Sequence, residues 1–176
     1  HGGAGLGGPR IIAMNGAAAI HDFELAAFGG TSEDVVAGLG DGTFGMAEET
    51  GREMNAAISA AARDHRGMGE GLALYLSARP ERPGYEVSVL LACHRQGIPV
   101  TVHTAVGAEI IHQHPAADGA AMGATSQRDF LRLVVSSSPH GMSPFIVGES
   151  PPISLTRSTT GGAGYGGSGP PSHTPA

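Results

Sequence analysis

Two neighbouring side chains that can handle protons lie near the start of the chain. His21 and Asp22 stand side by side in "MNGAAAIHDFEL", residues 14–25. An imidazole can carry a proton near neutral pH, and a carboxylate accepts hydrogen bonds from hydroxyl or amine groups. We therefore identify His21 and Asp22 as candidate catalytic residues for a small-molecule substrate, such as an amine.

Three small residues precede this pair and follow the apolar stretch "RIIA". If that stretch is a strand, Asn15, Gly16 and Ala17 form the turn at its carboxyl end, with His21 and Asp22 in or near the first turn of the next helix. Parallel α/β sheets bind ligands at this end, and N–H groups at a helix start can bind a phosphate. The alternative is that small residues only let a helix pack closely on the sheet.

A second set of donor groups lies in "HTAVGAEIIHQHPAAD", residues 103–118. It comprises His103, Glu109, His112, His114 and Asp118. On a strand, His112 and His114 would share a face, and two or three of these groups can bind a divalent metal. That reading predicts a metal-dependent hydrolase. The alternative is a polar loop whose histidines bond to backbone or contact a nucleotide. Because no H-E-x-x-H helix is present, we assign no metal ligands.

Three further features limit the chemistry. All ten basic residues are arginines, so no imine can form on a lysine side chain of this chain. Gly3, Gly5 and Gly8 spell G-x-G-x-x-G, but no strand precedes them, so the dinucleotide motif lacks its context. The single cysteine, Cys93, excludes an internal disulfide and is expected to be a buried thiol.

Apolar periodicity predicts the elements that must position these residues. Strands are expected over residues 11–14 and 98–103. Helices are expected over residues 21–28, 31–39, 46–63 and 71–79, and from about residue 86 to a C-cap at Gly97. Strands separated by helices imply a parallel sheet with a doubly wound, Rossmann-like α/β architecture.

Composition indicates one domain with atypical ends. Residues 1–10 form a glycine-rich lead, residues 11–135 the folded domain, and residues 136–176 an irregular tail rich in Ser, Pro and Gly. A net charge of −6 without a basic stripe argues against binding to nucleic acid or to a membrane surface. No apolar run could span a bilayer and no signal peptide is recognisable, so the expected compartment is the cytoplasm.

Three blocks of the sequence resemble the deoxyhypusine synthases and their bacterial homologues. They are "IIAMNGAAAIHDFELAAF", "GTFGMAEETGREMN" and "SVLLACHRQGIPVTVHTAVG", in the family's order, within a resemblance that covers about residues 11–133. The resemblance implies a Rossmann-like fold that binds NAD and assembles as a homo-oligomer, usually a tetramer. In that family NAD accepts a hydride from spermidine, and an aminobutyl group passes through an enzyme lysine.

The resemblance also assigns residues. It implies that Asn15, Gly16 and Ala17 form the NAD turn, and that Asp118 and Gly119 form a second cofactor-binding element. The family's paired acids fall near Ile20 and His21, with Asp22 the nearest carboxylate, and its catalytic lysine has no counterpart. We therefore expect a diverged or inactive homologue, incomplete toward its C-terminus. If the protein is active, the expected reaction is an NAD-dependent transfer.

Overall fold

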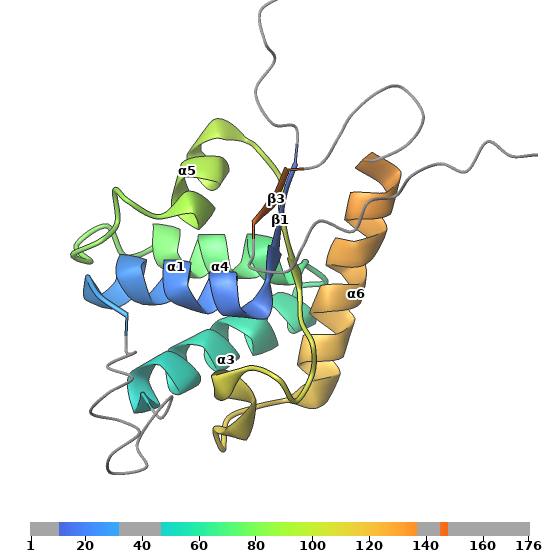
Figure 1. Cartoon of the computed structure of the whole chain (residues 1–176), viewed down its shortest axis with the longest axis horizontal. Coiled ribbons are helices and arrows are strands. Elements are labelled where there is room, and N and C mark those ends of the chain that lie inside the picture. The colour runs from blue at the N-terminus through green and yellow to red at the C-terminus, as the bar shows by residue number, and fades with distance from the viewer. Residues whose placement is uncertain (1–10, 32–46, 137–144, 148–176) are drawn as a thin grey trace, which may run out of the picture.

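The computed structural model describes residues 11–31, 47–136 and 145–147, and Figure 1 shows their arrangement. This part of the chain is mixed α/β and mostly helical. Its elements are β1 (Ile12–Asn15), α1 (Gly16–Phe28), α3 (Glu48–Arg63), α4 (Met68–Ser77), α5 (Val89–Gln96), β2 (Val100–His103), the 3-10 helix η1 (Ile110–Gln113), α6 (Gly119–Ser136) and β3 (Phe145–Val147).

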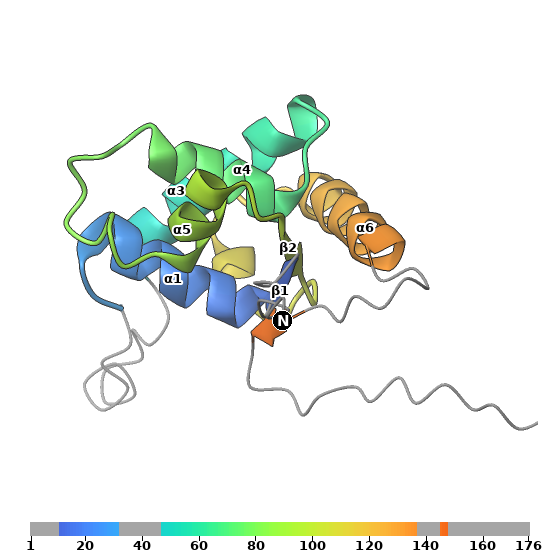
Figure 2. The ribbon, with the colours of Figure 1, turned by 90° about the horizontal axis from the view of Figure 1, so that it is seen from above.

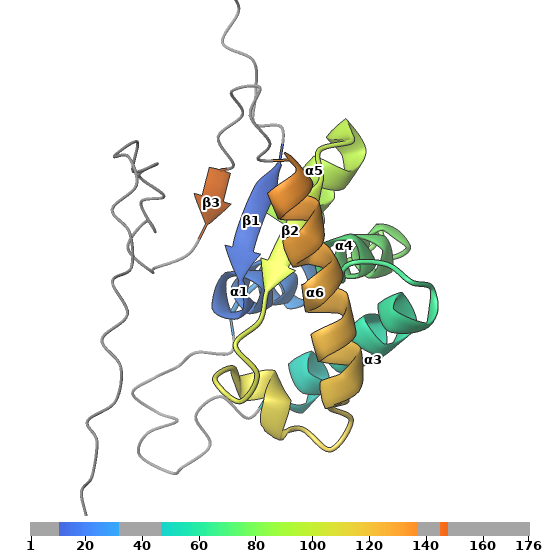
Figure 3. The same cartoon turned by 90° about the vertical axis from the view of Figure 1, so that its right-hand side faces the viewer.

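The strands form one small parallel sheet in the order β2-β1-β3. β1 and β2 run in register from the pair Ile12 and Val100 to the pair Asn15 and His103, and Ile12 also pairs with Phe145 of β3. Figures 2 and 3 show α6 on one side of the sheet and α1 on the other. The predicted α/β class with parallel strands is confirmed, whereas the described sheet is smaller than a doubly wound one.

The core lies between this sheet and the helices around it. Its fully buried side chains include Phe23, Leu72, Leu90, Leu91 and Val102. α4 packs closely on its neighbours because a Cβ at Gly69 would overlap the Val100 carbonyl, and one at Gly71 would overlap the Ala61 side chain. None of the helices in the described ranges is long and apolar enough to cross a membrane.

The junction between β1 and α1 differs from the predicted turn. Asn15 is the N-cap of α1, and its side-chain oxygen accepts a hydrogen bond from the Ala18 N–H at 2.8 Å. Because a capped start is followed by three alanines, the helix begins at once at Gly16. His21 and Asp22 therefore lie in the second turn of α1, and their predicted place in or near the first turn is wrong by about one turn.

The next predicted elements agree more closely with the structure. The helix expected over residues 46–63 is α3, and the helix expected over 71–79 is α4, which begins earlier, at Met68. Ser88 caps α5 by accepting from the Leu91 N–H, and Gly97 ends it in the left-handed region at φ 66. The predicted sequence of helix, glycine C-cap and strand is therefore confirmed.

The C-terminal half of the described chain departs from the predictions. Residues 110–113 form a 3-10 helix, so the strand that would have put His112 and His114 on one face is absent from this segment. The 18-residue helix α6 was not predicted, and β3 comes from the part expected to be irregular. The glycine-rich lead, the helix expected over 31–39 and the rest of the tail lie outside the described residues.

One buried side chain of α6 fixes both α4 and β2. The Asp129 carboxylate accepts hydrogen bonds from the Gly69 N–H at 2.9 Å and the Val102 N–H at 2.8 Å. Burial raises the pKa of this carboxyl from 3.8 to about 6, against the opposing effect of these N–H groups. The folded protein therefore binds a proton at Asp129 more tightly than the unfolded chain does.

We expect Asp129 to make the free energy of unfolding depend on pH between about 4 and 6. Its contribution is complete below pH 3.8 and is lost as the pH rises through about 6, because the charged form is disfavoured in the folded protein. Relative to Asp129→Asn, the wild type should gain about 2.5 kcal/mol between pH 7.5 and pH 4. Urea denaturation at each pH measures this difference. Asp64→Asn, at an exposed position, is the control, and parallel curves for wild type and Asp129→Asn would contradict the prediction.

Candidate functional site

A glycine and a carboxylate meet at the carboxyl ends of β1 and β2. Gly16, the first residue of α1, lies so close to Glu109 that an added Cβ would overlap the Glu109 carboxylate. Glu109 belongs to the segment that follows β2 and stands just before η1. This end of a parallel sheet is where α/β proteins bind ligands, and a helix start there favours an anionic group.

Glu109 forms a buried pair with His112. Their side chains are 9% and 8% exposed, and His112 Nε2 lies 3.1 Å from Glu109 Oε2. These two atoms are not aligned for a hydrogen bond, so neither has a hydrogen-bond partner in the described part of the chain. The other carboxylate oxygen, Oε1, accepts from the Ala105 N–H at 3.2 Å. The Glu109 side chain also accepts from the His112 backbone N–H in a capping box, so the carboxylate is held within its own segment, with Oε2 buried against the His112 ring.

The protonation state of His112 follows from its backbone contacts. Its Nδ1 accepts from the Gly107 N–H at 2.9 Å and from the Glu109 N–H at 3.3 Å. A ring nitrogen that accepts a hydrogen bond carries no proton, so the proton of the neutral ring is on Nε2, facing Glu109. That proton lies on the side of Glu109, but Nε2 and Oε2 make a 3.1 Å contact without hydrogen-bond alignment.

His21 lies beside this pair. A cavity of about 170 Å³ is lined by Ala17, Ile20 and His21 of α1 and by Ala108, Glu109 and Ile110. His21 is half-buried there, on the same side of α1 as Ala17. The structure therefore brings together three sequence-predicted site residues, Gly16, Ala17 and His21, with Glu109, which had been grouped only with possible metal ligands.

Asp22 has different surroundings. Its buried carboxylate accepts from Ser88 Oγ at 2.7 Å, from the Val89 N–H at 2.7 Å and from the Leu90 N–H at 3.0 Å. These donors are the first groups of α5, so Asp22 joins α1 to the N-terminus of α5. It does not line the cavity beside His21.

The remaining predicted residues act at helix starts. Asn15 caps α1, as described above, and Asp118 caps α6 by accepting from the Ala120 N–H at 2.9 Å and the Ala121 N–H at 3.1 Å. A Cβ at Gly119 would meet open space, so no group presses closely on that glycine. Asp118 and Gly119 do not line the cavity beside His21.

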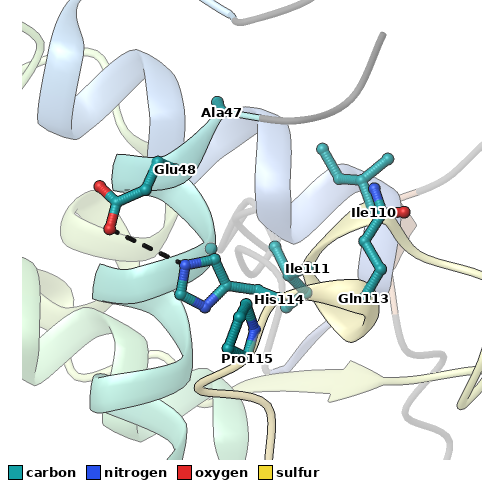
Figure 4. A pocket seen from close by; sticks show the side chains of 8 residues that line it. Ala47, Glu48, Ile110, Ile111, Gln113, His114 and Pro115 are labelled. Carbon is teal, nitrogen blue, oxygen red and sulfur yellow. Dashed lines mark ion pairs between the residues drawn. The ribbon is translucent and has the colours of Figure 1, made fainter. Parts of the chain in front are cut away.

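A larger cavity lies between the start of α3 and η1, and we call it the α3–η1 cavity (Figure 4). Its volume is about 490 Å³, and its lining residues are Ala47, Glu48, Gly51, Ile110, Ile111, Gln113, His114 and Pro115. His114 Nε2 lies 3.9 Å from Glu48 Oε1. Sequence reasoning did not find Glu48 or Gly51, although a glycine inside a helix, where it costs about 1 kcal/mol, is itself a signal of close approach.

The two histidines of the proposed metal cluster have separate roles. His112 bonds to the backbone of residues 107 and 109, whereas the His114 ring packs on Gly51. Within the described ranges, no three His, Cys, Asp or Glu side chains lie close enough together to hold a metal ion. A catalytic zinc site uses three protein ligands, so these residues do not supply the set that a metal-dependent hydrolase requires.

No protein-family model, curated protein or solved structure matches this chain.

We expect Asp22→Asn to lower the free energy of unfolding, because Asp22 holds α1 to α5 and is not only a candidate catalytic residue. The amide would turn a donor toward the N–H groups of α5, leaving buried groups unpaired at a cost of about 2 to 4 kcal/mol. Urea denaturation measures the loss, with the exposed Asp64→Asn as the control. A change below about 0.5 kcal/mol, the usual range for exposed sites, would show that the cap is dispensable.

Proposed function

We propose that this chain is a Rossmann-like, NAD-binding protein of the deoxyhypusine synthase-like group, diverged from the family's lysine-dependent reaction. The observation that carries the proposal is the close approach of Gly16 to Glu109 at the carboxyl ends of two parallel strands. A position without a side chain, a helix start and an adjacent carboxylate are the parts with which α/β folds bind a dinucleotide.

The residues at this site fit such a ligand. Glu109 Oε2 has no hydrogen-bond partner in the described chain, but it is buried 3.1 Å from His112 Nε2, so a ribose hydroxyl would reach it only by displacing the His112 ring. Gly16 is buried beneath the Glu109 carboxylate at the start of α1, and the neighbouring exposed Ala17 adds little bulk. Bound NAD would supply the ability to accept a hydride.

The chain's own residues would position the reacting groups. His112, held by the Gly107 N–H, packs against Glu109, and His21 lines the adjoining cavity as a candidate proton carrier. Ile20 and His21 stand where the resembling family has acids, so attraction for a polyammonium substrate is reduced. Without lysine, no aminobutyl imine forms on this chain.

A homo-oligomer is part of this proposal. Phe130, Leu131, Val134 and Val135 of α6 are at least half exposed, and they recur at helical spacing. An apolar stripe of this kind is typical of a surface that another protein covers. A second copy of the chain is the partner that the resemblance favours.

We expect NAD to bind the wild type and to bind Glu109→Ala about tenfold more weakly or worse, because a hydrogen bond to a charged group contributes about 1.5 to 3 kcal/mol. Gly16→Leu should abolish NAD binding, because the leucine side chain would occupy the space between the start of α1 and Glu109. Isothermal titration calorimetry measures both effects. The matched control is Glu86→Ala, whose side chain is 81% exposed and lines neither cavity.

Melting curves test whether each variant is folded. If the wild type gives no heat with NAD, the proposal is wrong. Equal affinities for wild type and Glu109→Ala would remove Glu109 from the site, and tighter binding by Glu109→Ala would mean that the carboxylate repels the ligand's phosphates.

A further inference from the structure

The α3–η1 cavity has the size and walls of a site for a small organic molecule. At about 490 Å³ it falls within the range of about 300 to 1,000 Å³ typical of ligand sites. Ala47, Ile110, Ile111 and Pro115 give it apolar walls, and Figure 4 shows Glu48 and His114 facing each other at one side. The occupant is therefore a largely apolar body with a polar edge.

His114 offers one hydrogen-bond donor at that edge. Its Nδ1 accepts from the Ala116 N–H at 3.0 Å, so the proton of the neutral ring is on Nε2. The ring is fixed in place by Gly51, where a Cβ would lie 2.6 Å from its Cδ2 atom. Nε2 points toward Glu48 at 3.9 Å, which is too long for a hydrogen bond, so the donor remains available to a ligand.

Glu48 offers an acceptor beside that donor. Its carboxylate is held by Arg52 Nη1, at 2.8 Å from Oε2 and 3.2 Å from Oε1. Oε1 is also the oxygen that faces His114. The Glu48 side chain is 59% exposed, so the cavity presents a surface acceptor next to the fixed donor of His114.

We propose that the α3–η1 cavity binds the adenine base of a nucleotide. The amino group of adenine donates a hydrogen bond, and its neighbouring ring nitrogen accepts one, so this edge complements Glu48 and His114 together. The apolar walls cover the flat ring. A carboxylate ligand would be repelled by Glu48, and an alkylammonium ion would leave the His114 donor unused.

This inference rests on the proposed function, because the base is taken to be the adenine of the dinucleotide. The two cavities share Ile110 in their linings. A ribose bound at Glu109 and a base bound beside His114 would therefore lie on the two sides of one residue.

Calorimetric titration of the full chain with adenosine, purine riboside and nicotinamide mononucleotide tests the assignment. Purine riboside lacks the amino group of adenosine, so it should bind about tenfold more weakly or worse. Glu48→Ala and His114→Ala should each weaken adenosine binding by a similar factor. Glu49→Ala, the neighbouring exposed acid outside this cavity, is the matched control and should bind as the wild type does.

Each outcome decides one proposal. Adenosine binding that needs Glu48 and His114, without NAD binding, supports the base site and overturns the proposed function. NAD binding that is equal in wild type, Glu48→Ala and His114→Ala supports the proposed function and overturns the base site. Absence of adenosine binding, equal affinity for purine riboside, or displacement of adenosine by nicotinamide mononucleotide also overturns the base site.

Discussion

The buried carboxylate of Asp129 is the constraint on which the described fold depends. Among the described strands β2 is an outer one, and the N–H of Val102 bonds none of them. Asp129 of α6 accepts that bond together with the bond from Gly69 at the start of α4. An unpaired buried N–H would cost about 1 to 3 kcal/mol, so this one side chain replaces a missing strand. The carboxyl end of β2, and the segment holding Glu109, are positioned through it.

Small residues allow close contacts both in the core and beside the two cavities. The two explanations given for residues 15–17, a ligand-binding turn and close packing of a helix on the sheet, are therefore compatible. Gly69 and Gly71 let α4 approach β2 and α3, where a side chain would overlap core atoms. Gly16 and Gly51 make equally close contacts, but with the polar side chains of Glu109 and His114. Because these glycines have no Cβ, α4 lies closer to its neighbours in the core. For the same reason Glu109 and His114 can pack directly on a helix backbone, one at each cavity.

Sequence patterns located elements that depend on neighbouring residues, such as α3 and the Gly97 C-cap, because capping and periodicity are local. They could not locate contacts made across the chain. Asp22 reads as a catalytic neighbour of His21, yet it bonds Ser88, 66 positions away. Glu109 likewise reads as one acid in a polar segment until the fold brings it to Gly16. The alternation in "HQHP" was too short to distinguish a strand from a 3-10 turn.

The segment between β2 and α6 carries Glu109, the acceptor beside one cavity, and His114, the donor of the other, within a framework of its own bonds. Glu109 is held by the Ala105 N–H and His112 by the Gly107 N–H, while Asn55 of α3 donates to the Ile111 carbonyl at 2.9 Å. Ile110 lines both cavities, so a shift of η1 changes both together. Because the two cavities share this wall, two ligand groups joined in one molecule would lose less entropy on binding than two separate molecules.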